Sequence, residues 1–141
     1  MLILLTRIFL SCILIFFTIE YAYSYATNSP IQKDTVYSYA DVDDKPFPGT
    51  GMESLYKKWN STAKYPIQAR ANGVQGKVYV SFTVTENGDL IDLKVEQGIG
   101  YGCDEATIEA LKKIDIKWKP GIKNGEKVKV RMFLPFTFKL Q

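Results

Sequence analysis

The 141-residue sequence contains no histidine and only two cysteines, Cys12 and Cys103. Without histidine, the protein cannot use a catalytic triad with an imidazole base or a zinc site built from cysteine and histidine. Any intrachain disulfide would have to include Cys12. An excess of charge of one sign is also lacking, because the net charge is only +3. This charge is too small to indicate nucleic-acid binding, and we predict no nucleic-acid partner.

Long apolar runs are absent except near the N-terminus. The run between Arg7 and Glu20 has twelve residues, and a helix of that length spans about 18 Å, less than the roughly 30 Å of a membrane core. Small-x-small cleavage patterns that end at Ser24 or Ala26 follow it. We therefore expect residues 1–26 to be a secretory signal peptide, with an uncleaved membrane anchor as the alternative. In either case the rest of the chain is exported.

Catalytic motifs are missing as well. The carboxylates are scattered, no Gly-x-Ser-x-Gly occurs, and the glycine-rich stretch at 98–102 lacks the remaining residues of a phosphate-binding or dinucleotide-binding loop. We predict that the protein is not an enzyme and has no cofactor and no metal. Cys103 precedes Asp104 and Glu105, which would raise the pKa of its thiol, so we interpret it as a small buried residue.

The remaining sequence indicates one domain behind a short linker. Residues 27–41 are polar and irregular and are predicted to be the linker, and residues 42–141 the domain. Its first helix is expected at 50–59, where Thr50 and Glu53 match a capping box and the apolar residues have helical spacing.

Two further helices are predicted from their end signals. Pro66 occupies the first position of a short helix that Gly73 ends. Asp104 is the expected N-cap of a helix that extends to about Ile114.

Three strands complete the predicted domain. Residues 77–85 alternate with period two, and Asn87-Gly88 predicts a two-residue hairpin turn into a return strand with Ile91, Leu93 and Val95 on one face. The last strand has the strongest pattern, seven successive even positions that are all apolar: Val128, Val130, Met132, Leu134, Phe136, Phe138 and Leu140. The sequence thus predicts an α+β fold, a small antiparallel three-stranded sheet with helices packed on one face.

The last strand is also the best candidate for binding. Nine residues between Lys112 and Lys139 are basic and two are acidic, so this part of the chain carries positive charge. Pro135 cannot donate a hydrogen bond, which suggests that one side of the strand is not fully paired. Such a strand suits the addition of a peptide strand, preferably an acidic one. The alternative is that its lysines only protect the edge from aggregation.

Seven motifs, in this order, resemble the TonB C-terminal domain family in the form found in Bacteroidetes-like bacteria. The resemblance extends from about Val42 to Leu140, and a Pro-Phe-Pro-Gly segment at 46–49 precedes it. The motifs are Tyr65-Pro66-x-x-Ala69, Gly76-Lys77-Val78-x-Val80-x-Phe82-x-Val84, Asn87-Gly88, Asp104-x-Ala106, Trp118-Lys119-Pro120-Gly121, Asn124-Gly125 and Leu134-Pro135-Phe136-x-Phe138.

The resemblance implies a periplasmic module that docks on outer-membrane TonB-dependent receptors by strand addition and supports energy-dependent transport. The implied partners are the TonB-box peptide of a receptor and the proton-driven motor proteins of the inner membrane. The motif at Trp118 to Gly121 is interpreted as structural, a packed indole and a turn. The implied partner-binding residues are Lys64, Tyr65, Val128, Lys129, Val130, Arg131, Met132 and Phe133.

Two departures from the family pattern qualify this expectation. The sequence has no histidine for coupling to the motor, and residues 27–33 span only about 22 Å when extended. The energy-coupling half is therefore missing or supplied elsewhere.

The alternative function is a secreted or envelope-associated structural module that forms a homodimer or pairs with another envelope protein. A third interpretation is a binder of acidic polymers. We expect a periplasmic location, either released or anchored to the inner membrane.

Overall fold

The structure is a computed structural model that describes residues 34–140. The predicted leader, Cys12 and the first part of the predicted linker lie outside the described residues. Within 34–140, no helix is long and apolar enough to cross a membrane. The elements are β1 (Val36–Ser38), the 3-10 helix η1 (Tyr39–Asp41), β2 (Phe47–Pro48), α2 (Met52–Thr62), α3 (Ile67–Ala71), β3 (Gly76–Val84), β4 (Leu90–Gln97), α4 (Cys103–Lys113), β5 (Trp118–Lys119), β6 (Gly121–Lys123) and β7 (Glu126–Phe138).

The centre of the fold is the antiparallel sheet of β7, β3 and β4, in that spatial order. Its longest ladder joins β3 to β7, from the pair Gly76 and Phe138 to the pair Val84 and Val130. This confirms the three predicted strands. Three further short pairings extend the sheet or flank it: β1 lies parallel to β7, β6 pairs antiparallel with β7, and β2 pairs with β5.

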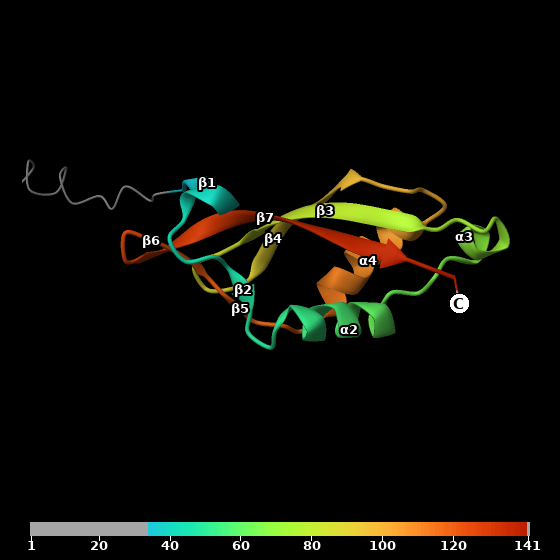
Figure 1. The fold of residues 1–141 in the computed structure, drawn as a ribbon, viewed down its shortest axis with the longest axis horizontal. Helices are drawn as coiled ribbons and strands as arrows, with labels where there is room; N and C mark the ends of the chain where they lie inside the picture. Colours follow the sequence, from blue (N-terminus) through green and yellow to red (C-terminus); the bar gives the residue numbers. More distant parts are fainter. Residues whose placement is uncertain (1–33, 141) are drawn as a thin grey trace, which may run out of the picture. The chain divides into compact units, whose positions relative to one another are not determined.

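The helices α2 and α4 lie on the same face of the sheet, as Figure 1 shows. On α2, the ring of Trp59 packs 5.1 Å from that of Phe136 and 5.3 Å from that of Phe138. On α4, the buried side chains include Thr107 and Leu111. The predicted α+β fold with helices on one face is therefore confirmed.

The alternating pattern of the last strand produces the expected burial. The even positions from Val128 to Phe138 point into the core and are buried, with Leu134 half-buried. Leu140 lies beyond the end of β7. The odd positions face away from the helices, and Phe133 is 59% exposed there. The strand therefore has one core face and one outer face over its whole length.

The return strand differs from the prediction. Asp92 has a positive φ of 54°, and the register with β3 shifts nearby, between Ser81 and Thr83. This bulge reverses the alternation, so Ile91 is 38% exposed on the outer face instead of packing beside Leu93. The prediction that Ile91 shares the core face was wrong, because alternation cannot reveal an inserted bulge residue.

The two Asn-Gly turns have different lengths. The turn between β3 and β4 is closed by Thr85, whose amide donates to the carbonyl of Asp89 at 2.9 Å. It therefore has a three-residue loop with Gly88 at φ +80°, and the predicted two-residue turn was wrong. The two-residue turn lies between β6 and β7, where Asn124 and Gly125 both have positive φ.

Gly88 also lies against the Trp118 motif. The Trp118 amide donates to the Gly88 carbonyl at 3.1 Å, and a Cβ on Gly88 would lie 2.0 Å from the Trp118 carbonyl oxygen. The indole of Trp118 packs on Phe82 at 5.3 Å. The interpretation of Trp118 as a packed indole is confirmed, but it lies in the short strand β5 and is not part of a simple turn.

The helix starts also differ from the predicted caps. Gly51, not Thr50, is the N-cap of α2, and it makes no side-chain capping bond. Pro66 is the N-cap of α3, one position before its first residue. Asp104 lies in the first turn of α4, where its carboxylate accepts hydrogen bonds from two amides of the preceding loop at 2.9 and 3.2 Å. Its role is to hold that loop on the helix.

Cys103 is fully buried, as predicted. Burial, followed by the charges of Asp104 and Glu105, raises the pKa of its thiol.

The predicted irregular character of 27–41 does not hold for its last part, since Val36–Ser38 form β1. Whether residues 42–141 form the whole domain stays a prediction, but the compact unit of the described residues begins at Asp34.

We expect Phe136→Ala to lower the free energy of unfolding by about 3–5 kcal/mol, because a fully buried ring leaves a cavity beside Trp59. Phe133→Ala on the opposite face of the same strand is the matched control and should change it by no more than about 0.5 kcal/mol. Urea unfolding of both variants measures this. Equal losses would contradict the assignment of the two faces.

Candidate functional site

The candidate site is the edge of β7 that faces away from β3. Val130 and Arg131 pair with β3 and with β1 at the same time, so β1 lies on the edge opposite β3. Beyond Arg131, from Met132 to Phe138, no strand among residues 34–140 pairs with this edge. We call Met132–Phe138 on this side the open edge. An edge of this kind presents unpaired backbone donors and acceptors to an incoming strand.

Pro135 lies in the middle of the open edge, and its register partner in β3 is Tyr79. The prediction that one side of the strand is not fully paired agrees with this geometry. Proline has no amide hydrogen, so it is confined to edges where no ladder bond is required of it.

The predicted strand residues are divided by β1. Lys129, Val130 and Arg131 pair with Val36–Ser38 along the edge where a partner strand was expected. Val128 pairs with Gly121 of β6. Of the predicted residues on β7, Met132 and Phe133 lie on the open edge.

The second predicted contact region lies at the far end of the open edge. Tyr65 packs its ring edge-on against Phe138, with 5.3 Å between the ring centroids. Its hydroxyl donates a hydrogen bond to the Val74 carbonyl. Lys64 precedes it and is exposed. The structure thus brings Tyr65 next to the end of β7 although 73 positions separate Tyr65 from Phe138 in the chain.

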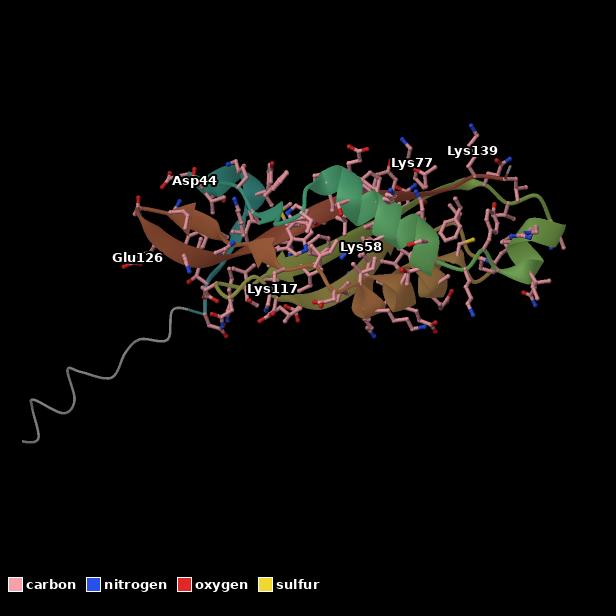
Figure 2. All side chains as sticks on the ribbon, turned by 90° about the horizontal axis from the view of Figure 1, so that it is seen from below. Asp44, Lys58, Lys77, Lys117, Glu126 and Lys139 are labelled. Atoms are coloured by element: carbon pink, nitrogen blue, oxygen red, sulfur yellow. The ribbon has the colours of Figure 1, made fainter. Side chains whose placement is uncertain are left out.

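A groove lies at this end of β7 and includes residues that sequence reasoning missed. Arg70 lies over the ring of Tyr65, 5.7 Å from its centroid. Trp59, Arg70, Thr137 and Lys139 line the groove with Tyr65. Figure 2 shows Lys139 at the same end as Lys77. No sequence signal identified Trp59 or Arg70, because both belong to helices that tertiary packing brings to the strand.

The groove combines aromatic surface with hydrogen-bond donors. The indole nitrogen of Trp59 is buried and has no hydrogen-bond partner among the described residues. Arg70 and Lys139 add positive charge. Such a groove fits an apolar side chain that is followed or preceded by a carboxylate.

At the other end, β1 is held by polar contacts. Lys129 Nζ lies 2.5 Å from the Asp34 carboxylate, and Lys123 Nζ lies 5.2 Å above the ring of Tyr37. The hydrogen bond from Lys129, followed by its charge, lowers the pKa of Asp34, and Asp34 in turn raises the pKa of Lys129. The positive charge predicted for the outer face of β7 is therefore partly neutralised by Asp34.

No group of three metal-ligating side chains is found within residues 34–140. The arrangement offers backbone hydrogen bonds, aromatic surface and positive charge, which serve binding. The geometry supports the recognition of an extended chain along the open edge.

The comparisons with known proteins place this domain in a family. A family described as the Gram-negative bacterial TonB protein C-terminal matches residues 61–140, more than half of the chain. No curated protein sequence matches the chain.

Similar solved structures include solution structures of TonB C-terminal domains from two organisms. One from Helicobacter pylori is 25% identical over 64% of this chain and 94% of its own, with a TM-score of 0.48. A second from Helicobacter pylori is 25% identical over 64% of this chain and 82% of its own, with a TM-score of 0.44. One from Pseudomonas aeruginosa is 24% identical over 74% of this chain and 96% of its own, with a TM-score of 0.41.

We expect the carboxyl of Asp34 to titrate below its ordinary pKa in the intact protein and to return toward that value in Lys129→Met. Because the folded pKa is lowered, the contribution of this pair is present above the ordinary pKa and is lost as the pH falls through the lowered one. NMR titration of the carboxyl measures both. Lys127→Met, an exposed lysine on the same strand, is the control. Identical midpoints in the two variants would contradict the pairing.

Proposed function

The chain belongs to the Gram-negative TonB C-terminal domain family, and on that premise we propose that it docks on outer-membrane TonB-dependent receptors through the open edge of β7. The family is a non-enzymatic transport module that acts in the periplasm and generally couples energy to outer-membrane receptors. The finer statement, that this chain binds the TonB-box segment of a receptor as an added strand, is our proposal.

The observation that carries the proposal is the unpaired stretch Met132–Phe138. Its neighbour on the other side, β3, forms a continuous ladder with it, so the backbone of the open edge is held extended and in place. A peptide added there gains main-chain hydrogen bonds without a change in the core. The preformed edge also lowers the conformational entropy lost on binding.

Side chains on both sides of the open edge supply selectivity. Phe133, 59% exposed, gives an apolar contact on the outer face. The groove of Tyr65 and Arg70 at the end of the strand gives an aromatic and basic contact. Together they favour a partner strand with apolar residues and an acidic group. The proposed contact residues therefore combine the predicted Lys64, Tyr65, Met132 and Phe133 with the groove.

We further propose that docking serves energy-dependent transport, with proton-driven motor proteins of the inner membrane as the source of energy. The proposed contact residues all lie within residues 34–140. The motor link depends on partners or on segments outside residues 34–140. The proposed location is the periplasm, and the domain acts there either released or tethered.

The test uses a synthetic peptide that carries the TonB box of an outer-membrane receptor from the same organism. We expect Phe133→Ala to weaken its binding about tenfold, as loss of an exposed anchor residue does. Ile91→Ala, which removes an exposed apolar side chain from β4, is the matched control and should leave the affinity unchanged. Isothermal titration calorimetry measures both variants.

NMR mapping on the intact chain shows where the peptide binds. Shifts of the amides in the open edge and at Lys64 and Tyr65 support the proposal. Shifts confined to β4, or the absence of binding, would overturn it. Self-association through the open edge in the analytical ultracentrifuge, without peptide binding, would favour the structural module instead.

A further inference from the structure

The strand β1 occupies part of the edge that a partner strand would use. It pairs parallel with β7 through three residue pairs, from Val36 and Lys129 to Ser38 and Arg131. These β7 residues continue directly into the open edge. In Figure 1, β1 lies alongside β7 near the end of the sheet that carries β6. A peptide cannot pair with Lys129–Arg131 while β1 is there, because each strand edge accepts one partner.

We infer that Val36–Ser38 is an internal stand-in for the partner strand, which leaves the edge when a longer peptide binds. This inference rests on the proposed docking function of β7. Removal of β1 would extend the edge available to a partner from Met132–Phe138 to Lys129–Phe138, that is from seven residues to ten.

The burial of the segment indicates that few core contacts would be lost if it left. No residue from Asp34 to Asp41 is buried: Val36 and Ser38 are exposed, and Tyr37, which is partly covered, packs against the core cluster. The first buried residue of the described chain is Val42, which is 4% exposed and belongs to the core cluster. Val42 therefore anchors the chain, and the eight residues before it can detach. Segments with so few buried contacts open at low free energy.

The contacts that hold β1 are of the kind a partner can replace. For β1 itself they are ladder hydrogen bonds, the ion pair of Asp34 with Lys129 and the contact of Lys123 with Tyr37. In the residues that follow β1, Lys123 also donates to the Asp41 carbonyl, and Lys45 Nζ lies 5.3 Å from the centroid of the Tyr39 ring. In the pair of Asp34 with Lys129, 80% of the Asp34 side chain is accessible and 24% of the Lys129 side chain, so the carboxylate is the exposed partner. An incoming strand restores the ladder, and an acidic side chain at its start takes the place of Asp34 on Lys129. The partner that competes with the internal segment should therefore share its features: an extended peptide with a carboxylate two residues before an apolar strand residue.

A small cavity lies where β1 ends and the open edge begins. It has a volume of about 320 Å³ and is lined by Val36, Tyr37, Ser38 and Tyr39 together with Arg131 and Phe133. Phe133 thus belongs to the open edge and also lies beside β1. A peptide that binds the open edge meets β1 at this cavity, which is where displacement would begin.

The experiment adds the segment back as a separate peptide. The probe is a fluorescein-labelled synthetic peptide of residues 34–41, measured by fluorescence polarisation against the full chain. In the double variant Val36→Pro and Tyr37→Pro, successive amide donors of β1 are lost, so its ladder cannot form. The matched control, Val36→Thr with Tyr37→Phe, keeps every amide and the preference for a strand.

We expect the peptide to bind the proline variant at least about tenfold more tightly than it binds the unaltered chain or the control, because the internal strand competes in both of them. Lys129→Met in the proline variant should weaken its binding of the peptide. A peptide with Asp34→Asn should bind this Lys129→Met variant no more weakly than the unaltered peptide does. Failure of the peptide to bind the proline variant, with the amide spectrum showing an intact fold, would overturn the inference. Equal binding to the variant and to the unaltered chain would overturn it as well.

A receptor TonB-box peptide then separates the inference from the proposed function. Tighter binding of this peptide to the proline variant than to the unaltered chain supports both. Equal binding to the two chains keeps the docking function and overturns the displacement of β1. Binding of the internal peptide with no binding of the receptor peptide to either chain overturns the docking function and leaves the internal strand established. Asp34→Asn in the unaltered chain removes the ion pair with Lys129. It should weaken the pairing of β1 less than the proline variant does, and it introduces no proline.

Discussion

The rest of the structure depends on the ladder between β3 and β7, which pairs Gly76–Val84 with Phe138–Val130. Both strands place alternate side chains in the core, and both helices that cover the core rest on these side chains. The rings of Trp59 and Tyr56 on α2 lie 5.1 and 5.7 Å from that of Phe136. Burial of these side chains contributes to the hydrophobic stabilisation of the domain. It also holds the backbone of β7 in one extended conformation.

That constraint determines which edge of the sheet is open to the proposed partner. The helices cover one face of the sheet, and β3 occupies one edge of β7. The other edge pairs with the three-residue strand β1, and the part beyond Arg131 has no strand partner in the described chain. A rigid strand with an unpaired edge is a template for strand addition and, equally, a risk for aggregation. The basic side chains along the outer face of β7, together with β1 beside them, limit unspecific strand pairing. They still leave the open edge accessible to the proposed partner.

The short pairings around the central sheet have a common physical basis. The motif at Trp118 brings β5 against the loop of Gly88, whose close approach leaves no room for a side chain. It then leads through β6 into the two-residue turn at Asn124 and Gly125, which starts β7. The conformation of these turns sets the register in which β7 enters the sheet. Sequence patterns marked each turn, but the contact of Trp118 with Gly88 joins positions 30 residues apart and has no local signal.

By itself, the sequence determined the three central strands, the two helices before them and the one between β4 and β7, the core face of β7 and the burial of Cys103. These follow from periodicity and from local turn and breaker residues, which act over a few positions. Only the tertiary structure decided the bulge that turns Ile91 outward, the three-residue loop that ends at Gly88 and the parallel pairing of β1. It also brought Trp59, Tyr65 and Arg70 to the end of β7. An exposed three-residue strand such as Val36–Ser38 has too little hydrophobic pattern to reveal itself, because its partner, and not its own composition, makes it a strand.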